Sequence, residues 1–166
     1  MSVPTSIIFN QRSYWECTWY SFMTALSKQI SLDWKKIESE LNKNPAWLLT
    51  PNKAKVFFES RGYWKIESVP RLKAKALLNR GIPLVMSSNG IDWETTAKPP
   101  YCAVLTNRIG SHRFCCVWYD RHTRLLKIQN TWGEEWGDNG CFYIHADDLN
   151  KCTGFYRITP WLKNPS

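Results

Sequence analysis

The first half of the chain carries apolar residues at the spacing of helices. From Thr18 onward, every third or fourth residue is apolar, which predicts a helix with one buried face and places Cys17 at or near its N-terminus. Thr50 and Pro51 read as the N-cap and first residue of another helix, which Gly62 ends. Two more helices are predicted over about 33–43 and 70–80.

Beyond residue 81 the pattern changes to short apolar runs separated by turn residues. Strands are predicted over 82–86, 113–119, 125–129, 141–145 and 155–158, and residues 89–100 read as a polar loop. A helical half followed by an antiparallel half is the α+β pattern. We expect one domain over 1–166, with a helical lobe at about 11–80, a β lobe at about 81–160 and a cleft between them.

Composition supports a packed domain. Apolar residues make up 43% of the chain and ten residues are Trp, so disorder is not expected. No apolar run is long enough for a membrane span. The first ten residues do not resemble a secretory signal, which leaves the localisation open between the cytoplasm and export by a non-classical or removed-leader route.

The net charge of +8 bears on partners. Basic residues gather loosely between Lys53 and Arg80, which indicates either a solvated helical surface or attraction to an acidic partner. No nucleic-acid-binding motif accompanies them, so nucleic acid is not an expected partner.

The six cysteines show neither a CxxC pair nor a spacing with His that is typical of zinc sites, so we expect no metal and no cofactor. Reduced thiols are expected rather than a disulfide framework. Cys115 and Cys116 lie in an apolar run and are predicted to be small buried side chains.

Four polar residues in a fixed order carry the functional signal. Gln11 precedes Cys17 by six residues, and His112 precedes Asn130 by eighteen. A Cys thiol, a His base, an Asn that orients the base and an amide donor for an oxyanion are the parts of a thiol-based acyl-transfer site. A thiol at a helix N-terminus that pairs with an imidazole is favoured as the reactive thiolate. Trp132, two residues after Asn130, is positioned to cover the Asn–His contact.

Two motifs resemble the papain-like cysteine peptidases. The Gln11–Cys17 spacing is that of the family's first motif, and residues 130–144 (NTWGEEWGDNGCFYI) are similar to its Asn-Ser-Trp-Gly motif with a following Trp-Gly and Gly. The resemblance extends over about 11–29 and 110–146. It implies a papain-like fold with a barrel-like β lobe and cleavage of a protein or peptide substrate. The implied roles are nucleophile for Cys17, general base for His112, orienter for Asn130 and oxyanion donor for Gln11.

Departures from the family pattern concern the substrate cleft. Cys17 and His112 are 95 residues apart, against a family spacing of about 130–150, so the helical lobe is trimmed. Trp15 and Glu16 replace Gly-Ser before the nucleophile, and Arg113 replaces a small residue after the His. We expect Trp15, Glu16, Ser111 and Arg113 to shape a restricted cleft, with the Glu16 charge opposing thiolate formation.

Three functions fit these residues. The first is a cysteine peptidase that forms a thioester on Cys17. The second is a thiol enzyme of the same fold that acts on side chains, as a deamidase or an acyl transferase. The third is a catalytically silent binding module. A separate inhibitor and an acidic partner are considered as further binding partners.

Overall fold

The computed structural model describes residues 7–11, 16–31, 33–43, 50–60, 64–106 and 111–160. Its α-helices are α1 (Cys17–Ser27), α2 (Trp34–Asn42), α3 (Pro51–Ser60), α4 (Arg71–Asn79) and α5 (Trp93–Thr96), and a 3₁₀ helix, η3, spans Ala146–Lys151. Its strands are β1 (Trp64–Ser68), β2 (Leu84–Ser88), β3 (His112–Asp120), β4 (Leu125–Gln129), β5 (Cys141–His145) and β6 (Cys152–Pro160).

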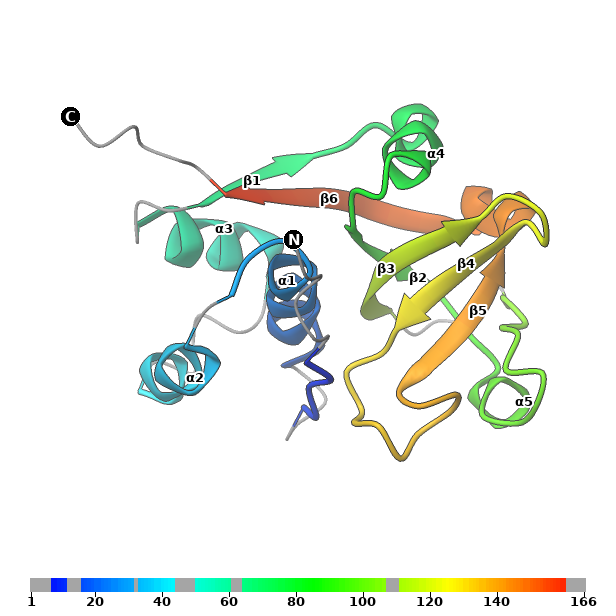
Figure 1. Ribbon diagram of the computed structural model, residues 1–166, viewed down its shortest axis with the longest axis horizontal. Coiled ribbons are helices and arrows are strands. Elements are labelled where there is room, and N and C mark those ends of the chain that lie inside the picture. Colours follow the sequence, from blue (N-terminus) through cyan, green and yellow to red (C-terminus); the bar gives the residue numbers. More distant parts are fainter. Residues whose placement is uncertain are drawn as a thin grey trace.

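All six strands form one antiparallel sheet in the order β1-β6-β2-β3-β4-β5. The helices α1, α2 and α3 lie together at one end of the molecule and β3, β4 and β5 at the other, while the long β6 extends across (Figure 1). The α+β class predicted from the sequence is therefore confirmed.

The local signals explain most of these elements. The Thr50 hydroxyl accepts a hydrogen bond from the backbone N–H of Lys53 at 3.2 Å and caps α3, as predicted. The predicted helices at 33–43 and 70–80 correspond to α2 and α4. The predicted end of α3 at Gly62 lies outside the described residues.

Two elements differ from the sequence-based expectation. The strand β1 lies in the half that was read as wholly helical, and it pairs with β6. The helix α5 lies in the expected loop 89–100, where the Asp92 carboxylate accepts a hydrogen bond from the backbone N–H of Thr95 at 3.2 Å. A short helix can form there because this cap satisfies an otherwise unpaired amide.

The sheet has an apolar core on each face. Residues of α1 and α3 pack with Val85, Cys115 and Ile158 on one face. On the other face, α4 and η3 cover a core that includes Met86 and Phe114. Side chains alternate between faces along a strand, so consecutive residues of β3 belong to different cores. Cys115 and Cys116 are fully buried on opposite faces, which confirms their prediction as buried side chains.

Candidate active site

Cys17 is the first residue of α1, the position predicted for it. The hydroxyl of Ser21 donates a hydrogen bond to the Cys17 carbonyl at 2.6 Å, which reinforces the first turn. The N-cap residue, Glu16, is buried but makes no side-chain capping bond. Cys17 thus lies in the first turn, at the positive end of the helix dipole.

Exposure separates Cys17 from most other cysteines. All six cysteines are free thiols, but only Cys17 and Cys102 are not buried. Burial raises the pKa of both Cys116 and Cys152 to about 12. A thiol with so high a pKa does not ionise near neutral pH, so it is a poor nucleophile. Of the two accessible thiols, only Cys17 begins a helix.

His112, the first residue of β3, makes a defined contact with Asn130. Its Nε2 lies 2.7 Å from the Oδ1 atom of Asn130. The same Oδ1 accepts a hydrogen bond from the backbone N–H of Thr131 at 2.9 Å, so this end of the Asn side chain must be the oxygen. Nε2 of His112 is therefore the donor in its contact with Asn130. In the neutral ring the proton then sits on Nε2, and Nδ1 carries a lone pair.

The second ring nitrogen of His112, Nδ1, is enclosed by the protein. His112 is buried, and its Nδ1 atom has no hydrogen-bond partner among the described residues. Burial, with a smaller contribution from the charge of Arg113, outweighs the Asn130 hydrogen bond and lowers the pKa of His112 to about 4. The imidazole is therefore neutral near pH 7, and Nδ1 is the ring nitrogen that can accept a proton.

Aromatic rings enclose the imidazole. The ring of Trp132 lies 4.9 Å from that of His112, at an interplanar angle of 39°. Trp93 of α5 meets His112 edge-on at 5.2 Å and 89° and lies 4.6 Å from the Trp132 ring. Such rings exclude water from the His112–Asn130 contact, which explains the loss of solvation that lowers the pKa of His112.

Gln11 lies against the loop after Asn130. Its backbone N–H donates to the Thr131 carbonyl at 2.6 Å, and the Thr131 hydroxyl donates to Oε1 of the Gln11 side chain. This second bond makes Nε2 the donor end of the Gln11 amide.

The strand-like segment 7–11 that carries Gln11 is held by the same loop. Asn10 forms a β-bridge with Trp132, and Gly133 donates its N–H to the Phe9 carbonyl at 3.1 Å. Gly140 permits this close approach because a Cβ atom there would stand 2.8 Å from the Ile8 side chain.

The residues predicted to shape the cleft have different environments. Ser111 is exposed just before β3, whereas Glu16 is buried. Trp15 lies outside the described residues. Arg113 is half-buried and close enough to Cys17 for the charges of the two groups to interact. The helix α1 packs on β3, and the interaction of Arg113 with Cys17 places the start of the helix near the start of the strand.

Two residues of this region were not singled out from the sequence. Thr131 holds both Asn130 and Gln11, and its place inside the Asn-Thr-Trp-Gly motif was a signal for it. Trp93 contacts His112 although nineteen positions separate them. The Asp92 cap and the following helix could have been read locally, but the ring contact depends on the tertiary fold.

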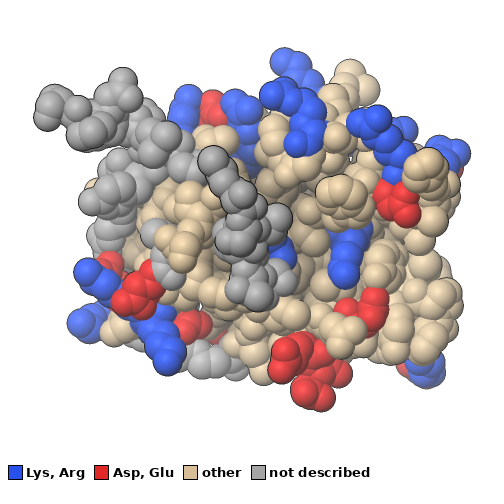
Figure 2. All heavy atoms as spheres, in the orientation of Figure 1, with Lys and Arg blue, Asp and Glu red and all other residues tan. Residues whose placement is uncertain are grey.

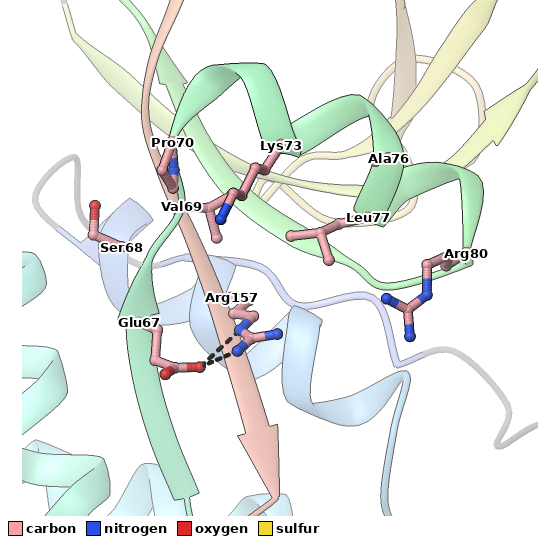
Figure 3. A pocket seen from close by; sticks show the side chains of 9 residues that line it. All are labelled: Glu67, Ser68, Val69, Pro70, Lys73, Ala76, Leu77, Arg80 and Arg157. Atoms are coloured by element: carbon pink, nitrogen blue, oxygen red, sulfur yellow. Dashed lines mark hydrogen bonds and ion pairs between the residues drawn. The ribbon is translucent and has the colours of Figure 1, made fainter.

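A groove on another part of the molecule lacks the residues needed for this chemistry. It lies between β1, α4 and β6 and is lined partly by Val69, Lys73, Leu77 and Arg80 (Figure 3). Glu67 and Arg157 form an ion pair at 2.6 Å within it. No Cys or His lines this groove.

Lys and Arg side chains gather along the edge of the molecule where β1 and α4 lie (Figure 2). This distribution agrees with the basic surface predicted from the sequence, whose acidic partner stays a prediction. No helix in the described part of the chain has the length and apolar character that a membrane crossing requires.

Comparison with known proteins finds partial matches. No protein-family model matches the chain. Over 53 residues it is 34% identical to an uncharacterized peptidase C1-like protein of Acanthamoeba polyphaga mimivirus. This match covers 30% of the chain and only 17% of the relative's length. Among solved structures, xylellain, a cysteine protease from Xylella fastidiosa, aligns with a TM-score of 0.49 and 25% identity, over 57% of this chain and 39% of that one.

The viral relative confirms the resemblance to papain-like cysteine peptidases that the two sequence motifs predict. The chain resembles these peptidases over a short matching region.

Proposed function

We propose that the protein is a cysteine peptidase that hydrolyses a peptide or amide bond through a thioester on Cys17. The observation that carries the proposal is the arrangement around His112. Its Nε2 is committed to Asn130, and its buried Nδ1 carries a lone pair with no partner among the described residues. A neutral imidazole held in one tautomer is what a general base for a thiol requires.

In the proposed reaction, His112 Nδ1 takes the proton of the Cys17 thiol, and the thiolate attacks the substrate carbonyl. The oxygen of the tetrahedral intermediate gains the negative charge. The Gln11 Nε2 amide and the Cys17 backbone N–H would donate to it, and such donors contribute about 3 kcal/mol each in other acyl-transfer enzymes. The Thr131 hydroxyl supports this role because it holds the Gln11 amide by Oε1, the end opposite the Nε2 donor.

The imidazolium then gives its proton to the departing amine, and the thioester forms. A water molecule that loses a proton to His112 attacks the thioester, the acid product leaves and the Cys17 thiol is restored. Asn130 keeps the ring in position through both steps, while Trp132 and Trp93 keep other water away from the Asn130–His112 bond.

A peptide library of varied sequence tests this proposal, because it requires no single substrate to be chosen. The library is incubated with the wild-type chain, with Cys17→Ala and with Cys102→Ala, and new termini are identified by mass spectrometry. Cys102 is the matched control, since it is the other thiol that is not buried. We expect new termini with the wild type and Cys102→Ala and none with Cys17→Ala.

Other results would reject peptide hydrolysis. Cleavage that persists in Cys17→Ala would exclude a Cys17 thioester. A mass gain of about one dalton on Gln side chains without new termini would indicate the deamidase alternative. No Cys17-dependent product of either kind would indicate the silent binding module.

A further inference from the structure

Arg113 is a half-buried cation that pairs with no carboxylate of the described residues. Its Nη1 atom is inaccessible to solvent and has no hydrogen-bond partner among the described residues. Arginine stays protonated in proteins, so the charge persists. An unpaired buried charge is costly to the fold, and an anionic ligand that paired with it would offset that cost.

The surroundings of Arg113 leave its donors unused. The guanidinium lies over the ring of Tyr156 in β6, with its central carbon 5.6 Å from the ring centroid. This contact is made to the face of the Tyr156 ring and forms no hydrogen bond, so it does not pair the N–H donors of the guanidinium group. Phe22 of α1 packs on Tyr156 at 5.9 Å and holds this ring between the helix and the sheet.

A glycine borders the buried end of the guanidinium. A Cβ atom on Gly154 would stand 3.5 Å from Arg113 Nη1 and 3.3 Å from the Ser87 hydroxyl. Gly154 itself has no side chain there, so no group of β6 at this position competes for Nη1. The three residues come from the neighbouring strands β3, β2 and β6.

Arg113 is also close to the nucleophile of the proposed reaction. It immediately follows His112 in β3, but it lies on the sheet face that α1 covers, and its charge interacts with Cys17. A carboxylate bound to the guanidinium would therefore belong to a residue near the bond under attack.

We propose that Arg113 determines specificity by binding an acidic side chain of the substrate close to the scissile bond. The planar fork of Arg matches a carboxylate in two parallel hydrogen bonds, so Asp or Glu would be preferred over Asn or Gln. This inference rests on the proposed thiol chemistry at Cys17.

The test uses peptide probes that carry an electrophile and label an active thiol irreversibly. Each pair of probes differs only in Glu or Gln, placed at the first, second or third residue from the electrophile. The labelling rate of Cys17 is measured by peptide mass spectrometry in the wild type, Arg113→Lys, Arg113→Gln and Arg113→Glu. A small uncharged alkylating reagent measures the intrinsic reactivity of Cys17 in each variant.

We expect the wild type to react about tenfold or more faster with the Glu probe at one position, as a charge-assisted hydrogen bond allows. The preference should be partly kept in Arg113→Lys, lost in Arg113→Gln and reversed in Arg113→Glu. The ratio of the Glu-probe rate to the Gln-probe rate is measured in the wild type, so this test does not depend on whether a variant folds.

Two kinds of outcome would overturn the inference, and they are distinguishable. Equal rates with Glu and Gln probes at every position, with Cys17 labelled, would reject the role of Arg113 in specificity and leave the thiol chemistry intact. That role is also rejected if Arg113→Gln slows both probes and the small reagent equally, because Arg113 would then act only on the thiolate. Failure of Cys17 to react with every probe would reject the proposed function as well.

Discussion

The Oδ1 atom of Asn130 accepts two hydrogen bonds, one from His112 Nε2 at 2.7 Å and one from the Thr131 backbone N–H at 2.9 Å. The backbone donor cannot be reoriented, so it fixes which end of the amide faces the imidazole. This relationship between Asn130 and His112 sets the tautomer on which the proposed mechanism depends.

Replacing Asn130 with Ala should slow the reaction of Cys17. The imidazole would lose its orienting partner, and Nε2 and the Thr131 N–H would both lack an acceptor. We expect about a tenfold or greater fall in Cys17-dependent turnover and a loss of about 1–3 kcal/mol in the free energy of unfolding. Asn89→Ala, on an exposed residue, is the control for both measurements. Unchanged turnover in Asn130→Ala would contradict the orienting role.

The buried His112 should make folding stability depend on pH. Its pKa is about 4 in the folded protein, against an ordinary value of 6.5. Between these pH values the unfolded chain binds a proton that the folded protein does not, so the free energy of unfolding falls as the pH is lowered from 6.5 to 4. The fall attributable to His112 is about 3 kcal/mol.

Denaturant titrations across that pH range, in the wild type and in His112→Gln, measure this contribution. The variant should lack the His112 part of the pH dependence. An identical slope in both proteins would show that His112 titrates at its ordinary pKa.

Opening the aromatic enclosure should raise the pKa of His112. In Trp93→Ala, water would reach the imidazole and solvate its charged form, which moves the pKa from about 4 toward the ordinary 6.5. NMR titration of the His112 ring protons measures the shift. Trp118→Ala is the control, since Trp118 is 59% exposed. An unchanged pKa of His112 in Trp93→Ala would mean that other groups exclude water from the imidazole.

Thr131 and Gln11 should act as one unit. Thr131→Val removes the hydroxyl that donates to Gln11 Oε1, so the amide would lose its fixed orientation. We expect Gln11→Ala to lower the turnover number by about 100-fold and Thr131→Val by a smaller factor with little change in KM. The double variant should be no slower than Gln11→Ala alone. If the double variant is slowed by the product of the two single-variant factors, Thr131 and Gln11 act independently.

Much of the fold could be predicted because its elements carry local signals. The apolar spacing after Thr18 predicts α1, and the Thr50–Pro51 pair predicts the start of α3. The strand β1 was missed although its residues alternate between buried and exposed positions from Trp64. Its identity as a strand depends on pairing with β6, more than eighty residues away, which a local pattern does not contain.

The site could be predicted in its residue types but not in its environment. Spacing and motif predict that Asn130 serves His112, and the structure brings the two together. The enclosure by Trp93 and the isolation of the Arg113 charge depend on which sheet face each residue occupies. Such contacts arise from tertiary packing, so no neighbouring sequence signal predicts them.

The pH dependence of Cys17 alkylation tests the central claim most directly. The rates at Cys17 and Cys102 are compared by peptide mass spectrometry in the wild type and in His112→Ala, with Cys102 as the accessible reference thiol. The account predicts that Cys17 reacts faster than Cys102 below about pH 7 and loses this advantage in His112→Ala. If Cys17 follows the ordinary thiol titration in both proteins, His112 does not activate it, and the proposed peptidase mechanism is wrong.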